Sequence, residues 1–227
     1  MATNNILLFK FKILSEFSIE EVVKSLENNP LEETRIIVND INNEDVLGTY
    51  IYSEVYKSKE YDFTTDTFET VTRKRYIVTE FHINLDGCFM DVWGSEKATQ
   101  RLISSISLAF DNRCIIEPCE LSFKKMISYF ERQDSISIGK ISAKQVPLGD
   151  ELLGDCSFDL SKHDNPFKVI SEYIDYIQKI GLKWKCVKTQ ISMTIYKSGA
   201  ISIYRNRHLI SEEELKNIYE MLLYSRR

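Results

Sequence analysis

The residues with the clearest binding chemistry lie between positions 176 and 211. This stretch holds seven lysines and arginines and no aspartate or glutamate, in a chain whose formal net charge is -5. Trp184, Tyr196 and Tyr204 are interleaved with these cations. Because lysine and arginine bind phosphates and aromatic rings stack on bases, the pattern favours a surface for single-stranded nucleic acid.

The predicted interface is a basic sheet face with two tyrosines as stacking platforms. Its residues are Lys183, Lys185, Lys188, Tyr196, Tyr204, Arg205 and Arg207. An alternative is that the rings pack against the other half of the chain or a second subunit while the lysines are only solvated, since exposed aromatic residues often mark protein interfaces. We therefore also expect a protein partner or a homo-oligomer.

Catalytic residues are harder to find in this sequence. It contains no glycine-rich phosphate loop, no His-Glu-x-x-His motif and no nucleophile elbow. His82, with Glu80 and Asp91 on the same predicted sheet face, could serve as an acid/base group or as half a metal site, although an ordinary surface salt bridge is the better explanation. We expect a non-catalytic binding or regulatory subunit without cofactor or metal, and an enzyme centred on His82 is the alternative.

The five cysteines are scattered and odd in number, which favours free thiols in a reducing compartment. The spacing of Cys114 and Cys119 matches no common zinc signature. No apolar run approaches the ~18 residues that cross a bilayer, and the N-terminus lacks the pattern of a signal peptide. These features predict a cytoplasmic protein that does not enter a membrane.

Charge is divided unequally between the two halves of the chain. Residues 1–113 carry a net charge of -7 and residues 114–227 a net charge of +2. This excludes a uniformly basic coat but allows a local basic face, because surface potentials depend on charges within roughly 10 Å. A cluster around the first helix could instead dock a basic protein, as an inhibitor or adaptor subunit would. Its members are Glu16, Glu20, Glu21, Glu27, Glu32 and Glu33.

Helix starts are marked by capping residues. The predicted N-caps are Ser18, Ser95, Asn165 and Ser211. Glu21 and Glu214 each follow their cap by three residues and complete capping boxes. Proline follows the cap at Asn165, so we expect that helix to continue to about Ile177 and to stop at Gly181. A further helix is predicted from about residue 119 to residue 132.

Strands are predicted where apolar and polar residues alternate, with hairpin turns at Gly87 and Gly199. The polar segment 58–72 is interpreted as a hairpin extension or a mobile loop, and residues 146–154, with one proline and two glycines, as a linker or loop. The second hairpin should bury isoleucines and expose Tyr196 and Tyr204. Around Trp184 either Trp184 or its neighbouring lysines face outward.

In the first hairpin, alternation places one set of residues toward the core and the other toward the open face. The expected inward residues are Ile77, Thr79, Phe81, Ile83, Cys88, Met90 and Val92. The expected outward residues are Tyr76, Val78, Glu80, His82, Phe89, Asp91 and Trp93.

The order of elements is similar in the two halves, which we take as residues 1–133 and 134–227. Each reads β-α-β-β-β-α, so we predict an α+β fold in which an antiparallel sheet has its helices on one face. This order resembles the TATA-binding-protein-like repeat fold, although no residue motif supports the resemblance and fold alone does not carry function. It implies a second sheet face open to solvent or to a partner.

Overall fold

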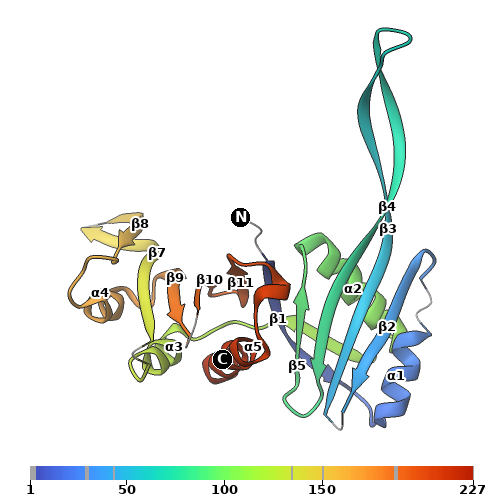
Figure 1. The fold of residues 1–227 in the computed structure, drawn as a ribbon. Coiled ribbons are helices and arrows are strands. Elements are labelled where there is room, and N and C mark those ends of the chain that lie inside the picture. Colours follow the sequence, from blue (N-terminus) through green and yellow to red (C-terminus); the bar gives the residue numbers. More distant parts are fainter. Residues whose placement is uncertain are drawn as a thin grey trace. The chain divides into compact units, whose positions relative to one another are not determined.

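The computed structural model describes residues 4–28, 31–42, 44–133, 135–149, 151–186 and 189–226. These residues form an α+β protein with a large antiparallel sheet and five α-helices (Figure 1). The chain divides into two compact units, one of Lys10–Ile116 and one of Met1–Phe9 with Glu117–Arg227. We call them the hairpin unit and the basic-face unit. Strand β1 (Asn4–Ile13) begins in the basic-face unit and ends in the hairpin unit.

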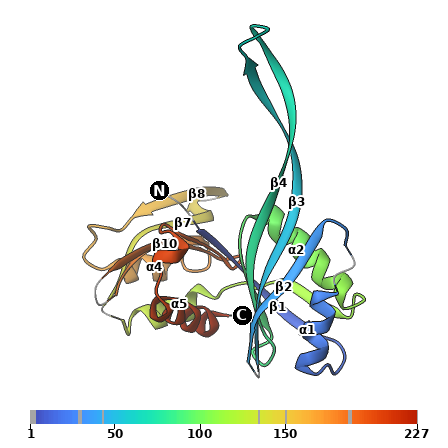
Figure 2. The same cartoon turned by 45° about the vertical axis from the view of Figure 1, so that its right-hand side comes forward.

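The hairpin unit has the strand order β2-β3-β4-β5-β1, with all pairs of β2 to β5 antiparallel. Its elements after β1 are α1 (Ile19–Glu27), β2 (Thr34–Ile41), β3 (Asp45–Asp62), β4 (Thr67–Asn84), β5 (Phe89–Trp93) and α2 (Glu96–Ala109). Figure 2 shows α1 and α2 side by side on one side of these strands. The side chain of Ser105 on α2 donates a hydrogen bond to the Tyr50 hydroxyl at 3.0 Å, and both residues are buried.

Helix starts in this unit follow the sequence signals. Ser18 and Glu21 form the predicted capping box, and Ser95 caps α2 by accepting a hydrogen bond from the backbone of Ala98. Both helices bury one apolar stripe, as an amphipathic helix on a sheet must. These local patterns specify the helices because every participant lies within one turn of the chain.

The β3–β4 hairpin is much longer than its neighbours. Its register runs without interruption from Asp45 opposite Asn84 to Asp62 opposite Thr67. The segment predicted as a hairpin extension or a loop is therefore a pair of strands, and Figure 1 shows that it projects beyond the other strands of its unit. At the turn to β5, Cys88 has a φ of 51° and is exposed, so its expected inward position was wrong.

The basic-face unit has the strand order β1-β11-β10-β9-β7-β8. Its further elements are β6 (Cys114–Pro118), which is shared with the hairpin unit, α3 (Phe123–Phe130), β7 (Ile136–Gly149), β8 (Leu152–Asp159), α4 (Pro166–Tyr173), β9 (Ile177–Lys185), β10 (Gln190–Tyr196), β11 (Ala200–Ile203), the short 3-10 helix η1 (Arg207–Leu209) and α5 (Glu212–Ser225). Alternation in the second hairpin is confirmed, since Ile191, Met193 and Ile195 are buried.

The helices of this unit cover the buried face of its strands. The ring of Tyr129 on α3 lies 6.4 Å from that of Trp184 on β9, and Tyr173 on α4 lies 4.7 Å from Phe158 on β8. Trp184 is 5% exposed. Of the two arrangements open for this strand, the one with Trp184 inward is therefore correct, and the lysines beside it face outward.

Two predicted boundaries were wrong, and one strand was missed. Residues 146–154 belong to strands β7 and β8. They tolerate Pro147 and the glycines because the register of β7 with β9 ends at Ala143, so this part of β7 pairs with β8 alone, and that pairing contains register shifts. Helix α4 ends at Tyr173, and Ile177 already belongs to β9, which continues through Gly181. Strand β6 was not predicted, because its apolar run is too short to show a period.

The two units differ in how their strands are arranged. In the hairpin unit the first strand, β1, lies beside the last, β5, whereas in the basic-face unit β7 pairs with β9. The predicted duplication and its resemblance to the TATA-binding-protein-like fold therefore stay predictions. Among the helices of the described residues, none has the length and hydrophobicity needed to cross a lipid bilayer.

Candidate functional site

The face of the basic-face unit opposite its helices carries two of the lysines predicted from the sequence. Lys183 lies opposite Ser192 and Lys185 opposite Gln190, and both lysines are exposed. Tyr204 is 40% exposed, and its hydroxyl lies 3.0 Å from the Thr194 hydroxyl of the neighbouring strand. The sheet thus brings Lys183, Lys185 and Tyr204 to one surface.

A hollow of about 500 Å³ opens on this unit, and we call it the basic hollow. It is lined by Ser142, Ala143, Lys144, Asp155, Cys156, Ser157, Gln178, Lys179, Tyr196, Lys197 and Ser198. Three lysines face one carboxylate, so the hollow is cationic within an acidic protein. Its volume lies in the usual range of small-ligand sites, ~300–1,000 Å³.

The strand register sets the geometry of the basic hollow. Lys179 on β9 lies opposite Tyr196 on β10, and its ammonium group is 5.9 Å from the centre of the tyrosine ring. This distance is typical of a cation–π contact. The backbone amide of Lys197 donates to the carbonyl of Gln178 at 2.9 Å, and that of Lys144 donates to the carbonyl of Tyr176 at 3.0 Å. Main-chain hydrogen bonds therefore fix the backbone positions from which the side chains of Lys144 and Lys197 extend.

The carboxylate in the basic hollow has a structural partner. Asp155 accepts a hydrogen bond from the backbone amide of Gln145 at 3.2 Å, at a position where φ is 55°. Such bonds hold a tight backbone turn, so Asp155 does not serve only as a counter-charge to the lysines. The predicted interface did not include these three lysines. Lys144 comes from β7, far from the basic stretch in the sequence, and Lys197 lies in the turn after β10, where alternation assigns no face.

Two of the predicted site residues lie elsewhere. Arg205 pairs with Glu214 at 2.9 Å and donates to the carbonyl of Gln190 at 2.8 Å, and its side chain is 17% exposed. Arg207 lies in η1, and Lys188 lies outside the described residues. The structure therefore brings Lys183, Lys185, Tyr196 and Tyr204 to the outer face, while the guanidinium of Arg205 is engaged within the protein.

Glu214 is the centre of the network around Arg205. Burial alone would raise the pKa of Glu214, but hydrogen bonds from Thr189, Ser211 and Arg205 outweigh it and lower the pKa overall. Glu214 also closes the capping box at the start of α5. The pKa of the nearby Cys186 thiol is raised, mainly by burial and to a smaller extent by the charge of Glu214.

No known protein-family model matches this chain, and no curated protein is significantly similar to it in sequence. The chemistry of its own residues is therefore the basis for a functional hypothesis.

The alternative catalytic constellation is a partly buried cluster in the hairpin unit. His82 Nδ1 lies 2.9 Å from an oxygen of Asp91, and Nε2 lies 2.8 Å from an oxygen of Asp45. Glu80 is exposed and lies opposite Trp93. The sequence did not indicate Asp45, which comes from β3. Both ring nitrogens of His82 contact carboxylates in this arrangement, so a substrate would have to displace one of them to exchange a proton with the ring.

Electrostatics in this cluster favour an ion pair. Burial would lower the pKa of His82, but the hydrogen bonds and charges of Asp91 and Asp45 outweigh it and raise the pKa overall. For Asp45, burial is likewise outweighed by hydrogen bonds from His82, Asn84 and Asn42, so the pKa is lowered. Among the described residues, no group of three or more potential ligands has the geometry to hold a metal ion.

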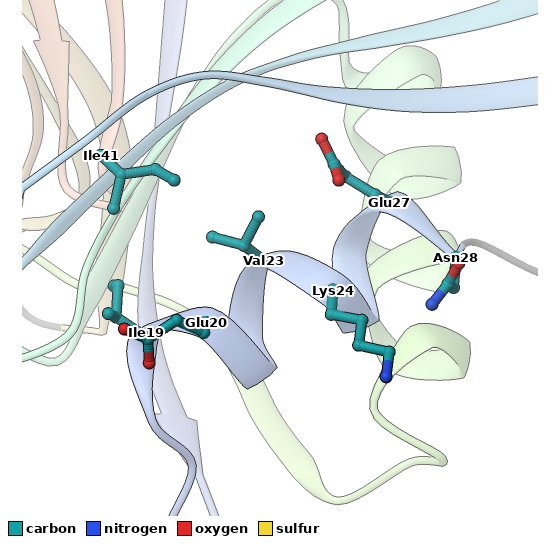
Figure 3. Close-up of a pocket in the computed structure, with 7 residues that line it drawn as sticks. All are labelled: Ile19, Glu20, Val23, Lys24, Glu27, Asn28 and Ile41. Carbon is teal, nitrogen blue, oxygen red and sulfur yellow. The ribbon is translucent and has the colours of Figure 1, made fainter.

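A second hollow, of about 350 Å³, lies between α1 and the end of β2 in the hairpin unit (Figure 3). We call it the α1 hollow; it is lined by Ile19, Glu20, Val23, Lys24, Glu27, Asn28 and Ile41. Two other members of the predicted acidic cluster are engaged elsewhere. Glu21 caps its own helix, and Glu33 pairs with Lys74 at 2.8 Å. Only Glu20 and Glu27 of that cluster line the α1 hollow.

Proposed function

We propose that this protein is a non-catalytic binding subunit whose basic hollow and adjoining sheet face hold single-stranded nucleic acid. The observation that carries the proposal is the convergence of Lys144, Lys179 and Lys197 around Tyr196 in one hollow. Lysines gathered in one hollow can contact backbone phosphates, and the tyrosine offers a ring on which a base can stack.

The outer face extends this surface beyond the basic hollow. Lys183, Lys185 and Tyr204 are exposed on the same side of the sheet, where a strand leaving the hollow would meet further cations and a second ring. A duplex has no exposed base faces for stacking, so we expect preference for single strands. Binding should tolerate sequence changes, since none of these groups reads base edges with fixed bidentate geometry.

The test is a titration of fluorescently labelled single-stranded and duplex oligonucleotides at several salt concentrations, followed by anisotropy. We expect the double variant Lys179→Ala with Lys197→Ala to reduce the slope of log affinity against log salt by about 1 to 1.5, at roughly 0.7 per phosphate contact. Tyr196→Ala should weaken binding at all salt concentrations, by about 5- to 100-fold for a lost stacking contact.

A matched control removes the same charge from the helices of this unit. Lys168 on α4 and Lys216 on α5 are exposed, so Lys168→Ala with Lys216→Ala changes the net charge equally without touching the basic hollow. The proposal predicts that this control keeps the salt slope. No binding at low salt, or an equal loss of slope in the control, would refute it.

A protein-docking role is the second candidate, and the α1 hollow favours it. Ile19, Val23 and Ile41 form an apolar floor beside the carboxylates of Glu20 and Glu27 (Figure 3). Such a surface suits an amphipathic segment with basic residues. Titration calorimetry with a lysine- and leucine-rich helical peptide tests it, and Glu20→Gln with Glu27→Gln should weaken binding at least threefold.

Three further hypotheses rest on fewer observations. The order of elements in the two halves supports an internal duplication, although their strand orders differ. An enzyme centred on His82 would need a substrate to displace Asp91 or Asp45 from the ring. A cytoplasmic location also stays an expectation from the free cysteines.

A further inference from the structure

The β3–β4 hairpin ends in an arm that has no neighbouring strand on either side among the described residues. Pairing with β2 ends at Tyr52, and pairing with β5 ends at Glu80. From Ser53 and Tyr76 outward the arm is a two-stranded ribbon, which extends roughly 30 Å at ~3.3 Å per residue. An isolated two-stranded ribbon is only marginally stable in water, so docking against another surface would stabilise it.

Ion pairs along one face hold the shaft of the arm. Arg73 contacts Glu60 and Arg75 contacts Glu54, each at 2.7 Å. At the base, hydrogen bonds from Lys97 on α2 and from Arg75 lower the pKa of Glu54 to about 2. These contacts run along the shaft and attach its base to α2.

The tip carries a cluster of aromatic rings in water. The Tyr61 ring lies 5.0 Å from that of Phe63 and 5.1 Å from that of Phe68. Phe63 is 89% exposed and Phe68 is 71% exposed. Aromatic side chains grouped in this way are typical of the residues that dominate binding energy in protein interfaces.

Charge at the tip selects the kind of partner. Residues 60–69 contain Glu60, Asp62, Asp66 and Glu69 and no lysine or arginine. Hydrogen bonds from Thr64 lower the pKa of Asp62, which keeps that carboxylate ionised. An acidic tip disfavours phosphates and anionic lipids, and it suits a cationic socket that can also accept an aromatic ring.

The chain itself carries a surface of that chemistry. The basic hollow combines three lysines with the Tyr196 ring in a volume of about 500 Å³. Lys183 and Lys185 add positive charge on the same face of that unit. Acid and aromatic groups on the tip therefore have their complements in the hollow of another molecule of the same sequence.

We propose that the arm tip of one copy, Tyr61 to Phe68, docks into the basic hollow of a second copy. The two surfaces in this contact are different, so it is heterologous, and repetition leads to a ring or an open chain of copies. The contact needs no nucleic acid, but it uses Lys179 and Lys197. If the basic hollow also binds nucleic acid, as proposed above, an oligonucleotide and the arm tip compete for these two lysines.

The test mixes two variants that are defective at opposite ends of the contact. Phe63→Ser with Asp62→Lys alters the tip only, and Lys179→Ala with Lys197→Ala alters the hollow only. In sedimentation velocity from about 1 to 100 μM protein at low salt, the wild type should associate reversibly and salt should weaken the association. Each variant alone should associate at least tenfold more weakly. Their equimolar mixture should form a one-to-one dimer that does not extend, because one intact tip and one intact hollow remain.

Three results would overturn the proposal. One is a wild type that is monomeric throughout this range, and a second is association that both variants retain. The third is a mixture that stays monomeric after both variants have lost association. Thermal unfolding of each variant checks that it is folded, and the substituted residues are not in the buried core. Oligonucleotide anisotropy with the tip variant reports separately on the proposed function, since its hollow is intact.

Discussion

His82 on β4 lies directly opposite Asp91 on β5, with the ring Nδ1 2.9 Å from a carboxylate oxygen of Asp91. Asp91 is fully buried, although alternation assigned it to the open face. Its burial favours a structural role for this contact, since a buried polar side chain needs hydrogen-bonding partners. A protonated His82 supplies one of them and joins Asp91 to Asp45 on β3.

This cluster predicts a pH-dependent contribution to stability. The pKa of folded His82 is raised above its unfolded value of about 6.5, so its stabilisation is present below that pH and is lost as pH rises through the folded pKa. The pKa of Asp45 is lowered, so its stabilisation is present above about pH 3.9 and is lost as pH falls. The cluster should therefore stabilise the fold most between about pH 4 and pH 6.5.

Replacing His82 with glutamine tests this dependence. We expect His82→Gln to lower the free energy of unfolding by about 1–3 kcal/mol near pH 5.5, with a smaller difference near pH 9. Urea unfolding at several pH values measures it, and the exposed His208→Gln is the matched control. A destabilisation that grows with rising pH would contradict the assignment.

The sequence predicted those features that depend on neighbours in the chain. Both capping boxes lie within four residues, and the structure contains them as expected. Contacts between distant residues could not be predicted in this way. Asp45 is 37 positions from His82. Arg205 contacts Glu214 only because the chain turns back at the start of α5. Periodicity assigned the faces of β10 correctly. It placed Asp91 of β5 on the open face, however, and could not show that this side chain is buried.

Gly199 is predicted to be essential for the turn beside the basic hollow. Its φ is 83°, and a Cβ atom there would lie 2.2 Å from the carbonyl oxygen of Cys119 and 3.2 Å from that of Leu8. Because both neighbours are backbone atoms, Gly199→Ala should lower the free energy of unfolding by more than about 2 kcal/mol. Chemical denaturation measures this. Gly139→Ala is the control, since its nearest contact is an ordinary 3.9 Å, and equal effects of the two changes would contradict the prediction.

The cysteines should differ strongly in reactivity. Cys88 is exposed, whereas burial raises the pKa of Cys114 and contributes with Glu214 to a raised pKa of Cys186. Since the thiolate is the reactive form, iodoacetamide at pH 7.5 should label Cys88 at least tenfold faster than Cys114 or Cys186. Mass spectrometry of digests follows the labelling, and Cys88→Ser should remove the fast phase. Labelling of Cys186 faster than that of Cys88 would contradict this prediction.

Arg205 and Lys179 should respond differently to substitution, although both belong to the same basic stretch of sequence. Arg205 contacts Glu214 at 2.9 Å, and the two side chains are 17% and 6% exposed. Breaking a largely buried pair leaves a charge without its partner, so Arg205→Ala should lower the free energy of unfolding by about 3 kcal/mol. Lys179→Ala, in the basic hollow, should change stability by less than about 0.5 kcal/mol.

The salt dependence of oligonucleotide binding should show the opposite order. Lys179→Ala should reduce the salt slope by roughly 0.7, whereas Arg205→Ala should leave the slope unchanged at temperatures where the variant is folded. A double-mutant cycle of Arg205→Met with Glu214→Gln gives the coupling between the two residues, which we expect to exceed about 1 kcal/mol. If Arg205→Ala instead reduced the slope without loss of stability, Arg205 would contact phosphate, as the sequence alone predicted.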